Sequence, residues 1–276
     1  MNRLSKEKRV QVIASLVEGL SMSATARVTG VSFNAVARLL DLAGIACARH
    51  HDLHVRGIKG RRNIQCDELW SFVYAKDKSL EWAVPIDDAG SAYTFTAFDA
   101  DSKLLVSYLV AMARDLESAT ILMKDLEGRL EKRPKLTSDS LAAYKQASRR
   151  AFGKKARLSQ IRKGEDTDHN TAYVERHNST FRTFNRRYVR KTIAFSKKLS
   201  RHIATTHLFA VYYNFCWIHG TLNVTPAMEA GIDDKLRDYE WIVDLIDEVR
   251  PKPKKPGPKK GTKYRPRGSR SSKPVK

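Results

Sequence analysis

The sequence predicts an α/β protein in which a mixed sheet flanked by helices follows an all-α helix-turn-helix domain. Two observations predict this fold. Residues 1–44 show only the apolar spacing of helices, whereas residues 63–249 alternate strand-like and helix-like segments. A polar, basic linker is expected at residues 45–62, and a basic tail occupies residues 250–276.

The 276 residues include 51 Lys and Arg against 30 Asp and Glu, a formal net charge of +21. Such an excess attracts polyanions, and duplex DNA is the commonest candidate. The tail from residue 250 holds twelve basic residues, six prolines and no acid, which leaves +9 for residues 1–249. Because the tail has too little apolar surface to fold, we expect it to be disordered.

The cysteines Cys47, Cys66 and Cys216 are widely spaced, so a reducing compartment is expected rather than a disulfide framework. The first residues do not resemble a signal peptide. No stretch approaches the roughly 18 apolar residues that a spanning helix needs. We therefore expect a soluble, cytoplasmic protein without a membrane partner.

The first 40 residues have the spacing of a helix-turn-helix. An apolar stripe predicts a first helix through Val10, Ile13, Leu16, Val17 and Leu20. A second helix is expected near residues 23–29, where Ala26 allows a close crossing and Gly30 supplies the turn. The third helix packs back onto the first two through Val31, Val36 and Leu39.

This arrangement predicts an outer face of the third helix that enters the major groove, formed by Ser32, Phe33, Asn34, Ala37 and Arg38. From this face we expect Ser32, Asn34, Ala37 and Arg38 to contact DNA. Asn34 suits adenine, and Arg38 suits guanine or a phosphate. The alternative is a three-helix packing module without a DNA role.

The middle region is rich in β-branched and aromatic residues. Strands are expected at 64–74, 81–86, 93–98 and 135–138, with a turn at 87–90. Helices are expected from Leu116 to Leu130, from 141 to 150 and from 171 to 188. Three antiparallel strands, a helix, a fourth strand and further helices predict the mixed sheet.

Three acids stand out by their context. Asp67 lies inside the first expected strand, Asp139 ends the fourth, and Glu175 lies on the late helix. An acid inside an apolar strand is costly unless a cation or a donor compensates it. Glu68 is a rival for the first position, and we expect it to point away. The alternative is that each acid serves only in a turn, a pair or a solvated face.

On the late helix, Glu175, Asn178 and Arg182 share one flank, so Glu175 is able to reach the two aspartates while Arg182 contacts phosphate. Three hard carboxylates around one crevice suit Mg²⁺ or Mn²⁺ better than zinc. Two such ions about 3.5–4 Å apart activate an attacking hydroxyl and stabilise the leaving oxygen.

Two basic segments accompany the acids. Residues 145–163 carry eight Lys or Arg and residues 176–207 carry nine, and neither contains an acid. One-sided charge of this kind suits a groove that follows a DNA backbone, and a solvated helix face is the alternative. On the second segment we expect DNA contacts from Arg176, Asn178, Arg182, Arg186 and Arg187.

The histidines allow two interpretations. Cys47 with His50, His51 and His54 suggests zinc, but the irregular spacing favours chance clustering. His177 and His219 are each placed to assist catalysis, and a core or capping role is the alternative for each.

These residues resemble the DDE-type transposases of bacterial insertion sequences, especially the insertion-sequence-one kind. The stretch SATARVTGVSFNAVARLL is similar to the helix-turn-helix of that family. CDELW, TSDSLAAY and YVERHNSTFR are similar to its three acidic blocks, in order. YYNFCWIHGTLNVTPAMEAGI is similar to the stretch after its catalytic glutamate, so the resemblance covers roughly residues 21–231.

The resemblance implies an RNase H-like catalytic core in which Asp67, Asp139 and Glu175 are the catalytic metal ligands for Mg²⁺ or Mn²⁺. It implies DNA strand cleavage and strand transfer on double-stranded DNA, both element ends and target, by a nucleoid-associated homo-oligomer. Two alternatives stay open. One is a non-catalytic DNA-binding regulator derived from a transposase, and the other is a structural nucleic-acid-binding protein.

Overall fold

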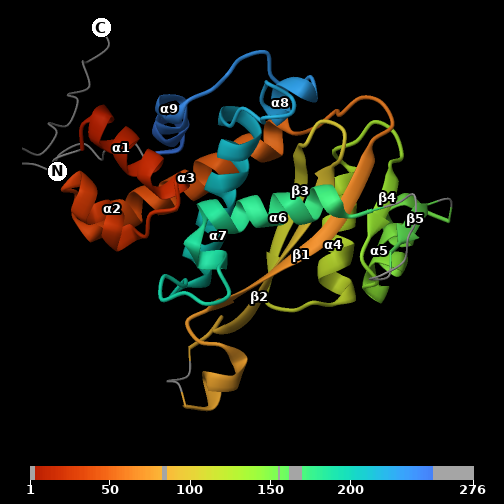
Figure 1. Cartoon of the computed structure of the whole chain (residues 1–276), viewed down its shortest axis with the longest axis horizontal. Coiled ribbons are helices and arrows are strands. Elements are labelled where there is room, and N and C mark those ends of the chain that lie inside the picture. The colour runs from red at the N-terminus through yellow and green to blue at the C-terminus, as the bar shows by residue number, and fades with distance from the viewer. Residues whose placement is uncertain (1–3, 83–85, 155, 162–169, 251–276) are drawn as a thin grey trace, which may run out of the picture.

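The computed structural model describes residues 4–82, 86–154, 156–161 and 170–250 (Figure 1). The tail that the sequence predicts to be disordered lies, apart from Arg250, outside these residues. Within the described part, no single helix is long and apolar enough to cross a membrane. Only the bent pair of the second and third helices reaches that length and composition, when the two are counted together.

A five-stranded mixed sheet carries the acids. Its strands are β1 (Asn63–Val73), β2 (Gly90–Asp99), β3 (Leu105–Ala111), β4 (Lys135–Ser138) and β5 (Arg157–Gln160). They are ordered β3-β2-β1-β4-β5. The pairs β1–β2 and β2–β3 are antiparallel, whereas β1–β4 and β4–β5 are parallel. This mixed sheet flanked by helices is compatible with an RNase H-like fold.

The expectation of a second strand at residues 81–86 is wrong for the residues that the structure describes. Residues Asp77–Trp82 form a 3-10 helix, η1, with no buried side chain, and residues 83–85 lie outside the described part. Trp82 is 87% exposed and Ile86 is 43% exposed, so the described residues of this segment do not pack in the core as strand residues would. The third antiparallel strand is instead β3, whose first three residues, Leu105, Val106 and Ser107, are buried.

Two helix layers cover the sheet. Helices α4 (Leu116–Glu127) and α5 (Ala142–Phe152) pack together on one face. The other face is covered by α6 (Ala172–Phe184), the 3-10 helix η2 (Arg186–Tyr188) and α7 (Leu199–Val211). Because side chains alternate along a strand, Leu69 of β1 packs toward α6, whereas Cys66 packs on the opposite face. Asp67 therefore faces α6, and Glu68 faces α5.

Three N-terminal helices follow the spacing expected from the sequence: α1 (Lys6–Val17), α2 (Met22–Thr29) and α3 (Phe33–His54). Ser5, Ser21 and Ser32 cap their N-termini, each accepting a backbone N–H in its side chain. Gly30 follows α2 with a φ of +69°, a left-handed conformation that glycine adopts readily. The bend between α2 and α3 is 117°, within the range of helix-turn-helix pairs.

The expected linker at residues 45–62 is wrong over its first ten residues, because α3 continues to His54. Ala46, Cys47 and His51 are buried, so the exposed polar residues of this segment form only one side of a helix. Gly44 allows α3 to cross α7 closely, since a Cβ there would lie 2.5 Å from the Cβ of Ala204. The physical reason is therefore tertiary packing that the local composition does not reveal.

The C-terminal elements join the N-terminal helices to the rest of the protein. After α7 come a π-helix, η3 (Tyr212–Cys216), a short helix, α8 (Pro226–Glu229), and α9 (Tyr239–Val249). Helix α9 packs against α1 and α3, and Arg9 forms an ion pair with Asp247 at 2.6 Å. One hydrophobic cluster includes residues of α1, α3, α4, α9 and the sheet. The N-terminal helices thus share a hydrophobic core with the sheet.

Candidate metal centre and nucleic-acid interface

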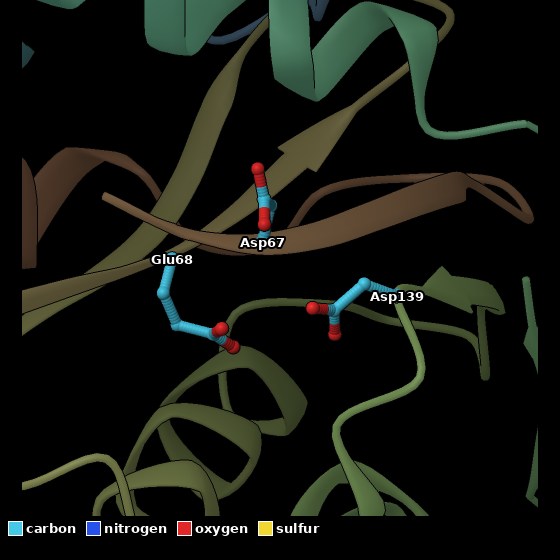
Figure 2. Close-up of side chains that lie close together, drawn as sticks. All are labelled: Asp67, Glu68 and Asp139. Atoms are coloured by element: carbon cyan, nitrogen blue, oxygen red, sulfur yellow. The ribbon is translucent and has the colours of Figure 1, made fainter. Parts of the chain in front are cut away.

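Asp67, Glu68 and Asp139 form an acid cluster at the centre of the sheet. Each offers one carboxylate oxygen, and these atoms all lie within 4.8 Å of one another. Figure 2 shows the carboxylates of Glu68 and Asp139 facing one another on one side of β1, while Asp67 rises from the other side. In the described part of the chain, this is the one group of three or more His, Cys, Asp or Glu at such spacing.

The register of two parallel strands brings the two aspartates together. Cys66 of β1 pairs with Ser138 of β4, so the residues that follow, Asp67 and Asp139, lie side by side. Asp139 is the first residue after β4, and its Oδ1 accepts a hydrogen bond from the backbone N–H of Leu141 at 3.0 Å. The expectation that a strand acid and a strand-end acid converge is met for this pair.

Glu68 does not point away from the cluster as expected. Alternation along β1 sends its side chain to the face of α5, and the loop after β4 carries Asp139 to the same place. The Glu68 side chain is only 3% exposed. Arg114, in the loop between β3 and α4, contacts both carboxylates. Its Nη2 lies 2.8 Å from Oε2 of Glu68 and 3.1 Å from Oδ2 of Asp139.

Glu175 lies near the cluster but outside the group of three. It is exposed in the first turn of α6, where its Oε1 accepts a hydrogen bond from Oγ1 of Thr171 at 2.6 Å. That bond holds the carboxylate toward the start of its own helix. Its charge still reaches Asp67, whose pKa it raises. The structure therefore brings Asp67 and Asp139 together and leaves Glu175 beside them.

Asn178 and Arg182 follow Glu175 on α6. Asn178 is 3% exposed, and its Nδ2 donates a hydrogen bond to Oδ2 of Asp67 at 2.7 Å. The expected DNA contact of Asn178 is thus wrong for a side chain buried against the acid cluster. Arg182 is half-buried near Asp67, and burial followed by the charge of Arg190 lowers its pKa, while the charge of Asp67 opposes the shift.

Burial raises the pKa of two carboxyl groups in the cluster. Burial, followed by the charges of Asp139 and Glu175, raises the pKa of Asp67 to about 6, while the Glu68 backbone N–H and Asn178 oppose the shift. Burial and the charge of Asp139 raise the pKa of Glu68 to about 6, against the Tyr144 hydroxyl and Arg114. Three clustered carboxylates, two of which share Arg114 as their cationic partner, fit a hard divalent cation such as Mg²⁺.

The outer face of α3 differs from expectation at one residue. Ser32, Phe33, Asn34 and Arg38 are exposed, and Ser32 also caps the helix, its Oγ accepting from the N–H of Ala35 at 3.3 Å. Ala37 is only 2% exposed, so its expected DNA contact is wrong. It belongs to the inner stripe with Val36 and Leu40, because α3 is covered on more than one side.

The other basic residues expected to contact DNA differ in exposure. Arg176 and Arg186 are exposed. Arg187 is turned inward, where its Nη1 donates to Oγ of Ser196 at 3.2 Å and burial lowers its pKa to about 10. This hydrogen bond holds the side chain against the segment that leads to α7, which argues against the expected DNA contact. Part of the segment 145–163, residues 155 and 162–163, lies outside the described residues.

Two residues of the Cys47–His54 cluster, Cys47 and His51, are buried in the core, whereas His54 is exposed. Cys47 is fully buried, and Nε2 of His51 lies 3.1 Å from the carbonyl oxygen of Leu105. His50 stacks on His54 with ring centroids 4.0 Å apart. In the described part of the chain these residues do not form a group at metal-ligand spacing. Chance clustering is therefore the interpretation that the geometry favours.

The two candidate catalytic histidines have packing and turn roles. His177 is buried among aromatic rings, with centroids 4.8 Å from Phe98 and 4.5 Å from Tyr213, and burial lowers its pKa to about 3. It is neutral at physiological pH. Nδ1 of His219 accepts a hydrogen bond from the N–H of Thr221 at 3.3 Å, which stabilises a turn.

Sequence reasoning missed Arg114 and misjudged Glu68. Glu68 carries a signal in the acidic pair at 67–68, but strand alternation argued against it. Arg114 directly precedes Asp115, the N-cap of α4, and nothing in the local sequence distinguishes it from a surface arginine. Only the fold brings it to the acids.

In comparisons with known proteins, the chain is similar only to solved structures. No protein-family model matches the chain, and no curated protein matches it. Among solved structures, it is similar to a chain in the crystal structure of the Mos1 strand transfer complex. The identity is 12%, the match covers 75% of this chain and 78% of that chain, and the TM-score is 0.28.

Proposed function

We propose that this protein is a metal-dependent transposase of the DDE type, resembling the insertion-sequence-one kind, which cleaves DNA strands and transfers them to a target. The observation that carries the proposal is the convergence of Asp67, Glu68 and Asp139 on one point of the sheet, within 4.8 Å. Carboxylates placed so closely repel one another, and a divalent cation is the ligand that best relieves the repulsion.

The donors are all carboxylate oxygens, which suits Mg²⁺ or Mn²⁺. Asp67 and Asp139 would hold the ions, with Glu68 and Glu175 as the adjacent donors. When bound, such ions supply Lewis acidity for the displacement at phosphorus. Asn178 orients Asp67 by its hydrogen bond of 2.7 Å, and the loop after β4 orients Asp139.

Double-stranded DNA is the proposed partner, both element ends and target. The exposed Asn34 and Arg38 on α3 form a surface for base readout, beside the capping Ser32. Arg176 and Arg186 are exposed, and the half-buried Arg182 lies near Asp67 on α6, which gives this segment a basic side. We propose that this basic side follows the DNA backbone and that the protein acts as a homo-oligomer on DNA.

A second candidate is a DNA-binding regulator derived from a transposase, without catalytic activity. Glu175 lies outside the group of three, and Arg114 already pairs with two of the clustered acids. Both observations suit a site that no longer takes a metal ion. This candidate keeps the same DNA surfaces.

A strand-transfer assay with Mg²⁺, using the DNA that flanks the gene as donor, tests the proposal. We expect Asp67→Ala, Asp139→Ala and Glu175→Gln each to abolish cleavage and joining while leaving binding to end DNA largely intact. Glu117→Gln, an exposed acid in the first turn of α4, is the matched control and should retain activity. Normal cleavage by the three variants would refute the assignment of the acids. Binding without cleavage by the unmodified protein would favour the regulator.

A further inference from the structure

We propose that Arg114 is an internal counter-cation of the acid cluster, paired with Glu68 and Asp139 in the metal-free protein and displaced from them by a divalent cation. The inference rests on the proposed function, because it requires that the cluster takes a cation. It adds a competition between the chain's own guanidinium and the metal ion for the same carboxylates.

The geometry of the guanidinium supports the proposal. Nη2 of Arg114 bridges Oε2 of Glu68 at 2.8 Å and Oδ2 of Asp139 at 3.1 Å. Nε makes a further hydrogen bond of 3.0 Å to Oε2 of Glu68. One nitrogen thus joins a carboxylate of β1 to a carboxylate that follows β4. These are two of the three acids that lie within 4.8 Å of one another.

In the metal-free protein, the acid cluster needs a positively charged partner such as the Arg114 guanidinium. The Glu68 side chain is 3% exposed, so a negative charge there is largely removed from water. Among the ion pairs of the described residues, only those of Arg114 reach Asp67, Glu68 or Asp139. A buried carboxylate without a partner is strongly destabilising. Arg114 therefore stabilises the metal-free protein by lying between the acids.

The Arg114 side chain is able to move away from the acid cluster. The Arg114 side chain is 41% exposed, and it extends from the short loop between β3 and α4 rather than from the interior of an element. A guanidinium keeps its charge at all physiological pH values, so it cannot vacate the site by losing a proton. It has to move toward solvent, and a divalent cation that binds the same oxygens has to displace it.

Metal titration of the full chain tests the competition. We expect Arg114→Ala to bind Mn²⁺ about three- to tenfold more tightly than the unmodified protein, because the competing charge is gone. Free Mn²⁺ is measured by electron paramagnetic resonance in metal-free buffer at pH 7.5. The matched control is Arg56→Ala, since Arg56 is 42% exposed, pairs with Asp52 and makes no contact with the cluster. The Mn²⁺ affinity of Arg56→Ala should equal that of the unmodified protein.

Thermal unfolding separates competition from a merely structural ion pair. Without metal, Arg114→Ala should have a lower Tm than the unmodified protein, and Mn²⁺ should raise that Tm by more than it raises the unmodified one. A lower Tm with unchanged or weaker Mn²⁺ affinity would overturn the proposal. Arg114→Lys covers the case in which Arg114→Ala does not fold. Lysine keeps the charge but loses the planar bridge, so we expect a near-normal Tm and tighter Mn²⁺ binding.

The two proposals fail in different ways. If neither the unmodified protein nor the variants of Arg114 bind Mn²⁺, both proposals are overturned. If the unmodified protein binds Mn²⁺, and Asp139→Ala abolishes this binding, the metal centre stands. Unchanged affinity in Arg114→Ala and Arg114→Lys would then overturn the counter-cation alone.

Discussion

Asn178 donates its side-chain Nδ2 to Oδ2 of Asp67 at 2.7 Å, which ties helix α6 to strand β1 inside the acid cluster. Asn178 lies one turn after Glu175 on α6 and is 3% exposed. The hydrogen bond favours the ionised form of Asp67 against the burial that raises its pKa. One amide therefore orients a proposed metal ligand and opposes the rise in its pKa.

Replacing this amide should weaken metal binding. In Asn178→Ala, the pKa of Asp67 should rise further above about 6, and the carboxylate should lose its fixed orientation. We expect Mn²⁺ affinity at pH 7 to fall by about 10- to 100-fold, as for other residues that orient metal ligands. A Mn²⁺ titration measures the change, with the exposed Thr183→Ala on the same helix as control. Unchanged affinity would show that the hydrogen bond does not position Asp67.

The raised pKa of Asp67 predicts a pH dependence of stability. Its pKa moves from 3.8 to about 6 on folding, so the neutral form is favoured in the folded protein. The resulting stabilisation is fully present below about pH 4 and is lost as pH rises through about 6. In the metal-free protein, Asp67→Asn should remove this loss of stability with rising pH. The Tm of the variant relative to that of the unmodified protein should therefore rise from pH 4 to pH 7. Glu117→Gln serves as control, and a difference that is independent of pH would contradict the assignment.

The crossing of α3 and α7 predicts a packing defect. In Gly44→Ala the added Cβ would lie 2.5 Å from the Cβ of Ala204, so the two helices would have to move apart. We expect a loss of about 1–3 kcal/mol in the free energy of unfolding, measured by urea denaturation. Gly220→Ala is the control, because a Cβ there has no neighbour within 4 Å. Equal stability of the two variants would mean that the crossing adapts without cost.

The exposed face of α3 predicts sequence-dependent binding. Arg38→Ala should weaken binding to the protein's own element ends more than to random duplex, by about 1–3 kcal/mol of discrimination. Fluorescence anisotropy at fixed salt measures both affinities. Arg49→Ala, an exposed arginine farther along α3, should affect the two duplexes equally. Equal losses for Arg38→Ala would reduce α3 to a nonspecific contact.

Much of the site could be predicted because it depends on strands that are legible in the sequence. Strand β4 lies at the residues expected, and β1 covers its expected range to within a residue at each end. Parallel pairing of these two strands then places Asp67 beside Asp139. The N-terminal helices were legible for the same reason, since apolar spacing and a glycine turn are local signals.

The parts of the fold and site that could not be predicted depend on contacts between segments far apart in the sequence. Strand alternation correctly places Glu68 opposite Asp67, but it does not reveal that Asp139 and Arg114 arrive on that side. Strand β5 has only four residues, RLSQ, with no apolar alternation to identify it. Glu175 lies on the expected helix, yet its hydrogen bond with Thr171 keeps its carboxylate out of the group. A side-chain rotamer of this kind leaves no trace in residue spacing.

The length of α3 has a consequence for how the protein would sit on its substrate. Its 22 residues extend about 33 Å, close to one turn of B-form duplex. Asn34 lies near one end, and near the other end His51 contacts the carbonyl of Leu105 in β3. Because α3 is one continuous helix that packs against α9, it joins the end that would read bases to the sheet that would cut. The length of α3 would therefore fix the number of base pairs between the recognised sequence and the bond that is cut.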